Sequence, residues 1–228
     1  MQRGLVSTRS QAETYIKLGQ VTVNNAITNK PSQLVSIDDK LVVTAKEQYV
    51  SRAGLKLASV ADELGLDFRG KVVLDVGSST GGFTDYVLKH GAAKVIAVDV
   101  GSNQLHPSLR TDVRIELHEQ TDIRDFKNTE PIDIVVADVS FVSLREILPC
   151  VSKLCNPQTQ IVAMVKPQFE TGTELKHKGV IKNDHIRRDI LKDFENWAKK
   201  EFVIINKADS KVAGEKGNLE RFFVLKKR

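Results

Sequence analysis

The chain has 228 residues, of which 41% are hydrophobic and 28% charged, and its formal net charge is +5. This length suits one α/β domain with a small appendage, because domains usually contain roughly 100 to 200 residues. The composition excludes a disordered, collagen-like or low-complexity chain, and the modest positive charge is compatible with a polyanionic partner without establishing one.

The sequence also disfavours a membrane-spanning segment, a signal peptide, a disulfide and a metal site. The apolar stretches 132–137 and 161–165 are far shorter than the roughly 20 residues that cross a bilayer, so they indicate buried strands. The first ten residues lack the pattern of a signal peptide, and we expect a cytoplasmic protein that does not associate with membranes. Cys150 and Cys155 have no CxxC pairing, and the five histidines are scattered singly. We therefore expect free core thiols and no metal site.

Residues 1–46 form a separate compositional unit. Ser7 is a suitable N-cap for a helix over 9–18, and short strands are predicted at 21–23 and 41–43 on either side of a turn-rich stretch. A helix and hairpin of this size have little hydrophobic core of their own. We therefore expect a small α+β module rather than a full domain.

This segment, "GLVSTRSQAETYIKLGQVTVNNAITNKPSQLVSIDDKLVV", resembles an S4 RNA-binding domain that is short at its N-terminus. The resemblance implies that a helix and a small sheet present basic side chains to structured RNA. Arg9, Lys17 and Lys30 are the candidates, because phosphates require positive charge more than base-specific groups. The competing interpretation of these residues is a solvated surface.

Residues 47–54 are expected to form a linker, and residues 55–228 a catalytic domain. Helical periodicity runs through "SRAGLKLASVADELGL", and strands and helices alternate beyond it. The predicted strands are 72–76, 94–98, 114–117, 132–138, 160–165, 202–208 and 222–226, and the predicted helices are 82–90, 143–154 and 184–199. This alternation predicts an α/β domain with right-handed crossovers and helices on both faces of a mostly parallel sheet.

A glycine-rich turn, "DVGSSTGGFT", joins the strand at 72–76 to the helix that follows. Such a turn lets a ligand approach the backbone closely, so a site is expected at the carboxyl edge of the sheet. Ser79 stands where the dinucleotide fingerprint requires glycine. A nicotinamide or flavin dinucleotide is therefore disfavoured.

The longer pattern "LDVGSSTGGFTD" resembles the first motif of class I S-adenosylmethionine-dependent methyltransferases, which have a Rossmann-like, seven-stranded sheet. In "VIAVDVG", Asp99 matches the acidic residue that accepts hydrogen bonds from the ribose hydroxyls, and in "EQTDIRD" Asp122 matches a residue that contacts adenine. The alternatives are an ordinary turn and a strand-end cap. The resemblance implies S-adenosyl-L-methionine as cofactor, and the cofactor-binding residues would be Asp75, Gly77, Ser79, Thr80, Gly81, Gly82, Phe83, Asp99, Asp122 and Asp138.

Further polar residues are expected in the same crevice, namely Lys56, Asp138, Lys166 and Glu220. A ribose 2′-hydroxyl is a poor nucleophile, so its attack on a sulfonium methyl group requires proton removal, which a lysine can perform if it is kept neutral. The motifs "SRAGLKL", "ADVSF", "VKPQFE" and "GNLERFF" resemble the Lys-Asp-Lys-Glu tetrad of FtsJ/RrmJ-like 2′-O-ribose methyltransferases. The resemblance implies that Lys166 is the general base and that the other three tune its pKa and hold the ribose. Each has an ordinary alternative as a surface cation, a turn cap or an ion-pair partner.

The segment after Lys166 is rich in cations and contains Gly172 and Gly179 as candidate hinges. This pattern predicts a basic lid over RNA, and a solvated loop is the alternative. With Arg52 near the linker, the expected RNA-binding cations outside the S4-like unit are Arg52, Lys176, Lys178 and Lys182, and the lid also carries Arg187 and Arg188.

An S4-like module followed by these motifs in this order resembles the TlyA family, members of which are often labelled haemolysins. The resemblance implies 2′-O-methylation of cytidine in ribosomal RNA, with ribosomal RNA or ribosomal subunits as partner. A cytolysin is disfavoured by the lack of a spanning segment, signal peptide or Trp-anchored amphipathic helix. A non-catalytic RNA-binding assembly factor stays open, whereas methylation of a protein or small molecule would leave the S4-like module unexplained.

Overall fold

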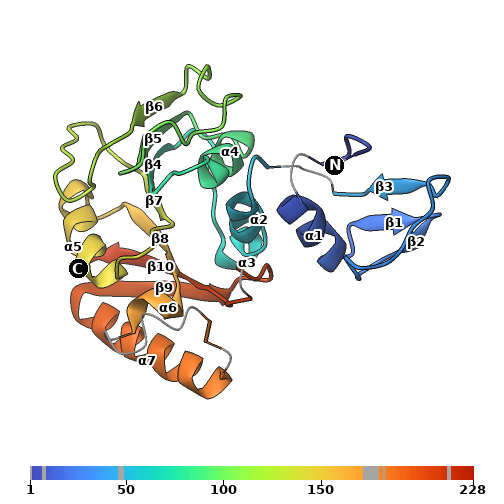
Figure 1. Ribbon diagram of the computed structural model, residues 1–228. Coiled ribbons are helices and arrows are strands. Elements are labelled where there is room, and N and C mark those ends of the chain that lie inside the picture. The colour runs from blue at the N-terminus through green and yellow to red at the C-terminus, as the bar shows by residue number, and fades with distance from the viewer. Residues whose placement is uncertain (1, 7–8, 46–48, 172–179, 182, 215–216) are drawn as a thin grey trace.

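The computed structural model describes residues 2–6, 9–45, 49–171, 180–181, 183–214 and 217–228. Figure 1 shows a small N-terminal module, in blue, beside a larger α/β domain. Helix α1 of the module lies next to helix α2 of the larger domain.

The N-terminal module consists of helix α1 (Arg9–Lys17) and strands β1 (Val21–Val23), β2 (Ala26–Ile27) and β3 (Leu41–Val43), in the antiparallel order β2-β1-β3. Strands β1 and β3 lie where they were predicted. Strand β2 lies in the stretch expected to contain only turns, because two residues are too few to show alternation. Ser7, the expected N-cap, is outside the described residues.

Asn24 and Asn25 make the hairpin turn between β1 and β2. Both have positive φ angles, of 50° and 68°. Two successive left-handed residues match the twist of a hairpin, and asparagine tolerates that conformation better than most residues.

The module packs against the larger domain through Tyr15. This side chain is completely buried and belongs to the hydrophobic cluster that includes Tyr49 and Leu57. One helical turn earlier, Gln11 Nε2 donates to the backbone oxygen of Tyr49 at 3.1 Å. Burial and a directed hydrogen bond therefore join the two parts.

The segment with helical periodicity after the linker is divided into α2 (Arg52–Ala58) and α3 (Ala61–Leu64), and Gly65 ends α3 with a φ of 67°. At the break, Ser59 Oγ donates to the backbone oxygen of Lys56 at 2.7 Å. A serine that bonds to nearby backbone competes with the helix, which explains the interruption.

The larger domain contains a seven-stranded sheet in the order β6-β5-β4-β7-β8-β10-β9. Strand β10 runs antiparallel to both neighbours and the other pairs are parallel, which confirms the predicted mostly parallel sheet. The strands are β4 (Val72–Val76), β5 (Lys94–Val98), β6 (Ile115–His118), β7 (Ile134–Ala137), β8 (Gln160–Val165), β9 (Phe202–Asp209) and β10 (Arg221–Lys227).

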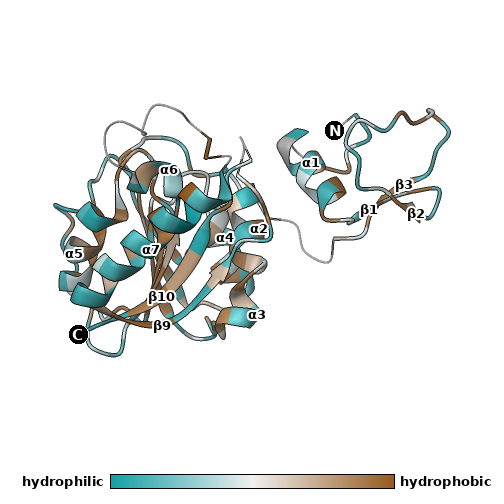
Figure 2. Cartoon of the chain, turned by 90° about the horizontal axis from the view of Figure 1, so that it is seen from below, coloured by the Kyte–Doolittle hydropathy of each residue, from teal (hydrophilic) through white to brown (hydrophobic). Residues whose placement is uncertain are grey.

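Helices cover both faces of this sheet. Helices α2, α3 and α4 (Gly82–Lys89) pack on one face, and α5 (Leu144–Leu154) and α7 (Asp184–Glu201) pack on the other. Helix α6 (Pro167–Glu170) follows β8 directly and was not expected, because one turn is too short to show periodicity. Figure 2 shows apolar strands in brown between helices whose outer surfaces are teal.

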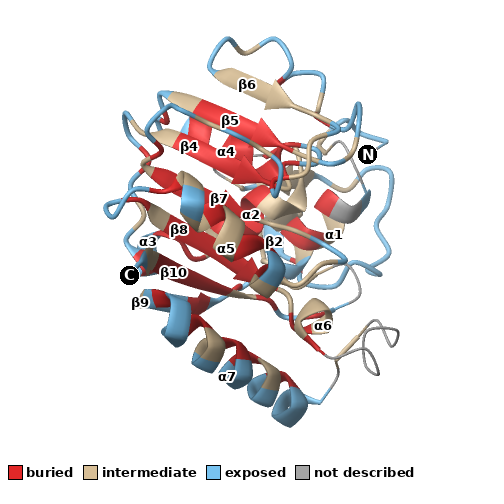
Figure 3. Cartoon of the chain, turned by 90° about the vertical axis from the view of Figure 1, so that its left-hand side faces the viewer, coloured by how far each residue is buried: buried red, intermediate tan, exposed pale blue. Residues whose placement is uncertain are grey.

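The two faces of the sheet bury alternate residues of the same strands. In β8, Val162 and Met164 face α2 to α4, whereas Ile161, Ala163 and Val165 face α5 and α7. Figure 3 shows the central strands in red, as buried, and β6 in tan. Strands covered on both faces appear in a sequence as continuous apolar runs, and this made β8 easy to predict.

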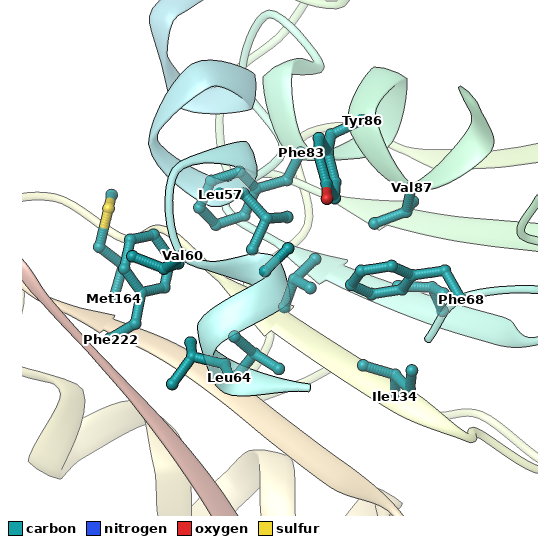
Figure 4. Close-up of a cluster of buried hydrophobic side chains, with 14 of the residues drawn as sticks. Leu57, Val60, Leu64, Phe68, Phe83, Tyr86, Val87, Ile134, Met164 and Phe222 are labelled. Carbon is teal, nitrogen blue, oxygen red and sulfur yellow. The ribbon is translucent and has the colours of Figure 1, made fainter. Parts of the chain in front are cut away.

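The face under α2, α3 and α4 joins the parts of the chain that carry the candidate site. Figure 4 shows Leu57, Val60 and Leu64 pointing towards Met164 of β8 and Phe222 of β10. The same cluster contains Phe83 of α4, whose ring centroid lies 6.0 Å from that of Phe222. This packing fixes α2 against the sheet next to the glycine-rich turn.

Candidate active site

A cleft opens at the carboxyl ends of β4, β5 and β7, where the crossovers on either side of β4 run in opposite directions. Its larger part is a cavity of about 530 Å³. A hollow of about 140 Å³ adjoins it and shares Gly77, Ser79, Asp138 and Ser140 with it. Lys166 also lines the hollow. An open α/β sheet places its ligand site at this kind of position.

The glycine-rich turn forms the floor of this cleft because side chains cannot fit there. A Cβ atom at Gly77, where φ is 80°, would lie 2.8 Å from the backbone oxygen of Asp138. A Cβ atom at Gly82 would lie 2.2 Å from Ser51 Oγ. The turn can therefore approach both the β7 loop and the start of α2.

Ser79 has a φ of 45° and is held in this left-handed conformation by two contacts. Its backbone nitrogen donates to Asp99 Oδ2 at 2.8 Å, and its hydroxyl donates to Gln104 Oε1 at 2.9 Å. The other oxygen of Asp99 accepts from Gly101 N at 2.7 Å. The Asp99 carboxylate thus joins the turn to the end of β5 and, since each oxygen accepts more than one hydrogen bond, can still receive a ligand.

Asp75 lies below the same turn and is 1% exposed. Thr84 Oγ1 donates to its Oδ2 at 2.6 Å, whereas its buried Oδ1 has no hydrogen-bond partner among the described residues. Burial, assisted by the negative charges of Asp138 and Asp99, raises the pKa of Asp75 to about 7. An unsatisfied carboxyl oxygen at this hollow suits a positively charged ligand group.

Lys166 and Asp138 meet in the wall of the hollow. Lys166 Nζ lies 2.6 Å from Asp138 Oδ1 and donates to Ser140 Oγ at 2.7 Å. The side chains of Lys166 and Asp138 are 11% and 16% exposed. The amine of Lys166 is thus held in place beside the hollow by two oxygen atoms.

Lys56 and Glu220 form a second, more deeply buried pair. Lys56 Nζ donates to Glu220 Oε1 at 2.9 Å, and their side chains are 11% and 3% exposed. Arg221 of β10 pairs with Val165 of β8 in antiparallel register. Glu220 and Lys166, the next residue on each side, therefore lie at the same edge of the sheet. Among the described residues no hydrogen bond or ion pair links the two pairs.

Asp122 lines the larger cavity, as expected of an adenine-contacting residue, together with Arg124. Hydrogen bonds from Arg124 lower the pKa of Asp122 and keep it charged. The Arg124 backbone nitrogen donates to Asp122 Oδ1 at 2.9 Å. A contact between Asp122 and adenine stays a prediction.

Two aromatic residues beside the ion pair were missed. Phe141 is 90% exposed, has a φ of 67° and lines the larger cavity. Its ring centroid lies 5.3 Å from that of Phe169, whose ring is 5.9 Å from Lys166 Nζ. Both follow a tetrad residue by three positions, in "DVSF" and "KPQF", and this repetition could have identified them.

The expected RNA-binding cations differ in their surroundings. Arg9, Lys17 and Lys30 are exposed on the N-terminal module, and Arg52 is partly exposed at the start of α2. Arg9 Nε pairs with Glu13 at 3.2 Å. The candidates Lys176, Lys178 and Lys182 lie outside the described residues, as do the candidate hinges Gly172 and Gly179.

Arg187 is not the exposed lid cation that the sequence suggested. It is buried, pairs with Asp209 at 2.6 Å and donates to the backbone oxygen of Leu219 at 3.0 Å. The side chain therefore supports the segment just before β10, which contains Glu220. Its neighbour Arg188 is exposed.

Other expectations concern thiols, metals and membranes. Cys155 is buried, and burial raises its pKa to about 11, whereas Cys150 is free but only partly buried and so is not a core thiol. The described residues contain no cluster of His, Cys, Asp and Glu suited to a metal ion. Within the same part of the chain, no helix has the length and apolar character needed to cross a membrane.

Comparison with known proteins identifies both parts of the chain. A model of the FtsJ-like methyltransferase family matches residues 49–228, and a model of the S4 domain matches residues 2–41. An S-adenosylmethionine-dependent methyltransferase from Mesorhizobium loti, 14% identical, shares the fold over 76% of this chain and 100% of its own, with a TM-score of 0.52. The predicted class I methyltransferase fold is thereby confirmed.

Two further matches extend over most of the chain. The 23S rRNA (cytidine-2′-O)-methyltransferase TlyA of Campylobacter jejuni is 41% identical over 85% of this chain and 77% of its own length. The solved structure of a candidate hemolysin from Streptococcus thermophilus is 36% identical, covers 99% of this chain and 85% of its own, and superposes with a TM-score of 0.75. The chain therefore belongs to the TlyA family, in which an S4 domain precedes an FtsJ-like methyltransferase domain.

Proposed function

We propose that the protein transfers a methyl group from S-adenosylmethionine to the ribose 2′-oxygen of a cytidine in ribosomal RNA. The observation that carries this proposal is the Lys166–Asp138 pair in the wall of a cofactor-sized cleft. The C. jejuni relative is named for this reaction. An S4 domain in the same chain supports an RNA substrate.

The residues present fit S-adenosylmethionine. Asp99 would accept hydrogen bonds from the ribose hydroxyls in the larger cavity, beside Asp122 for the adenine. The unpartnered oxygen of Asp75 would receive the α-ammonium group in the smaller hollow. The glycine-rich turn would accept the methionine part, because Gly77 lines both cavities and has no side chain to fill them.

The chemistry needs one group of the protein to accept a proton. S-adenosylmethionine supplies the electrophilic methyl group. Lys166 would take the proton of the 2′-hydroxyl, and Asp138 would hold the lysine in position at 2.6 Å.

Phe141 and Phe169 would orient the nucleotide. An exposed aromatic ring at the mouth of a cleft offers a stacking surface for a base removed from its helix, and enzymes that act on single nucleotides use such surfaces. The pair lies next to Lys166, so a stacked base would bring its ribose towards the same amine. The basic residues Arg9, Lys17 and Lys30 would contact the phosphates of the surrounding RNA.

Transfer of a tritiated methyl group from S-adenosylmethionine to ribosomal subunits that lack native modification tests the proposal. We expect label on a cytidine ribose with the wild-type protein and none with Lys166→Ala. Lys153→Ala, which removes an exposed lysine of α5, is the matched control and should retain activity.

Either of two results would contradict the proposal. Folded wild-type protein that labels neither subunit nor naked ribosomal RNA would favour a non-catalytic RNA-binding factor. Release of a dye from liposomes at low protein concentration, without methyl transfer, would favour a cytolysin.

A further inference from the structure

Two segments carry the proposed catalytic pair. The first, 138–143, follows β7, and the second, 166–170, follows β8. Contacts along the whole length of the two segments join them. Lys166 reaches back to Asp138 and Ser140. The rings of Phe141 and Phe169 lie against each other. Beyond both, Glu170 reaches the start of α5, where the first segment ends.

Glu170 makes the most deeply buried of these contacts, because its side chain is 1% exposed. Its Oε2 accepts from Ser143 Oγ at 2.6 Å, and its Oε1 accepts from Leu144 N at 2.8 Å. Arg145 Nε lies 3.6 Å from Oε2. A carboxylate at a helix N-terminus binds backbone N–H groups that have no partner within the helix, so the charge of Glu170 is satisfied where it lies.

This contact fixes the far end of both segments. Ser143 is the N-cap of α5, and its hydroxyl oxygen also accepts from Arg145 N at 3.1 Å. The near end of the first segment is held by β7, which ends one residue before Asp138. Glu170 is the last residue of α6, for which Lys166 is the N-cap, so the same contact holds the second segment.

Phe141, between Asp138 and Ser143, shows that the first segment needs such support. A phenylalanine with a φ of 67° is in a conformation that costs about 1 kcal/mol or more, and it persists only where the surroundings impose it. Its ring is 90% exposed, so burial of the ring does not impose the conformation. Anchoring of the segment at both ends can impose this backbone conformation.

We propose that Glu170 is a positioning residue for methyl transfer, which holds the β7 and β8 segments together and so keeps Asp138 aligned with Lys166. It acts through these segments and touches neither of the two catalytic side chains. The inference rests on the proposed function, because it assigns a role within that reaction.

Glu170→Gln preserves the size of the side chain and one acceptor oxygen but leaves Ser143 Oγ or Leu144 N without its present acceptor. Small displacements of reacting groups, near 1 Å, cost about 100-fold in rate. We therefore expect kcat to fall by about tenfold or more, while the Kd for S-adenosylmethionine and the KM for RNA change by less than about twofold. Single-turnover methyl transfer and calorimetric titration with the cofactor measure these quantities.

Asp193→Asn is the matched control. Asp193 pairs with Arg145 at 2.7 Å in the same cluster, but its side chain is 72% exposed and it contacts neither catalytic segment. Loss of this pair should leave kcat unchanged. Ser143→Ala removes the Glu170 contact from the other side, and it carries the test if Glu170→Gln does not fold.

The double variant Glu170→Gln/Ser143→Ala should lose less kcat than the product of the two single losses, since both changes weaken the contact between Glu170 and Ser143. Active wild-type protein with a folded Glu170→Gln variant of undiminished kcat would overturn the inference and leave the proposed function standing. So would a loss confined to KM or to cofactor affinity. Wild-type protein without methyl transfer would instead remove the proposed function itself.

Discussion

Asp75 combines burial, an unpaired oxygen and two nearby carboxylates, and each of these features opposes ionisation. Because its pKa is raised from 3.8 to about 7, the folded protein binds this proton more tightly than the unfolded chain does. The resulting stability is fully present at low pH and is lost as the pH rises from about 4 to about 7, by at most about 4 kcal/mol.

Asp75→Asn should remove this dependence on pH. The neutral amide retains the size of the carboxyl and cannot ionise, so the free energy of unfolding should no longer fall over this interval because of residue 75. Urea unfolding of both proteins at pH 4.5, 6 and 8 measures the difference. Parallel pH profiles for the two proteins would show that Asp75 ionises as easily in the folded state as in the unfolded one.

At Phe141, the effect of a substitution on the stability of the protein should separate from its effect on methyl transfer. Asparagine adopts left-handed backbone conformations more readily than phenylalanine, and the exposed ring loses little burial when it is removed. Phe141→Asn should therefore leave the melting temperature unchanged or higher, while kcat/KM for RNA falls by about tenfold or more through loss of base stacking, worth about 1 to 3 kcal/mol. Calorimetric melting and methyl-transfer kinetics measure the two effects.

Val113→Ala provides the control for Phe141, because Val113 is 98% exposed and lies away from the cleft. It should alter neither quantity. A Phe141→Asn protein with wild-type kinetics would show that the ring does not contact the substrate.

At the scale of elements, the Lys56–Glu220 pair joins α2 to the start of β10. Removing one member of a buried pair leaves the other charge unpaired, at a cost of about 3 to 5 kcal/mol. Glu220→Leu should therefore destabilise the protein by that order. The double variant Lys56→Met/Glu220→Leu should recover most of the loss, because apolar residues of similar volume replace buried ion pairs well.

Methyl transfer should stay lost in both variants if the pair holds the ribose. Guanidinium unfolding and the tritium assay together distinguish the two roles of the pair. Recovery of activity along with stability in the double variant would show that the pair is structural only.

The sequence predicted long elements better than short ones. Strands β4, β5 and β8 coincide with the predicted ranges, because their apolar runs are bounded by turn residues. Strand β2, helix α6 and the break after α2 were missed, because one or two residues, or a single turn, produce no periodicity. Their positions follow from contacts such as that between Ser59 and Lys56.

In the candidate site, the sequence could not predict which distant residues come into contact. Motifs suggested Lys56, Asp138, Lys166 and Glu220 as site residues, but not which lysine would pair with which carboxylate. The partners of Glu170 lie 26 and 27 positions away in the sequence, and those of Arg187 22 and 32 positions away. Contacts between distant segments depend on the assembled sheet, so local pattern could not reveal them.

At the scale of the whole molecule, Tyr15 joins the S4 module to the methyltransferase domain. Loss of a fully buried aromatic side chain costs about 3 to 5 kcal/mol, and here the loss falls on the contact between the two parts. Tyr15→Ala should therefore change a single cooperative melting transition into two. Tyr15→Phe, which removes only the hydroxyl, should keep one transition.

Differential scanning calorimetry of the three proteins tests this prediction. One transition at the wild-type temperature in Tyr15→Ala would show that other contacts, such as that of Gln11 with Tyr49, are sufficient to join the parts.

The position of β10 between β8 and β9 also determines the order in which the molecule can assemble. Strand β9 precedes β10 in the chain and pairs with β10 alone in the sheet described, so β8 and β9 each present an open edge until β10 enters between them. Open strand edges of this kind are prone to pair with other chains, which makes this interval the most vulnerable stage of folding. Because Glu220 immediately precedes β10, the step that closes the sheet also brings Glu220 to Lys56. A partly folded intermediate that lacks β10 therefore also lacks one member of the proposed tetrad.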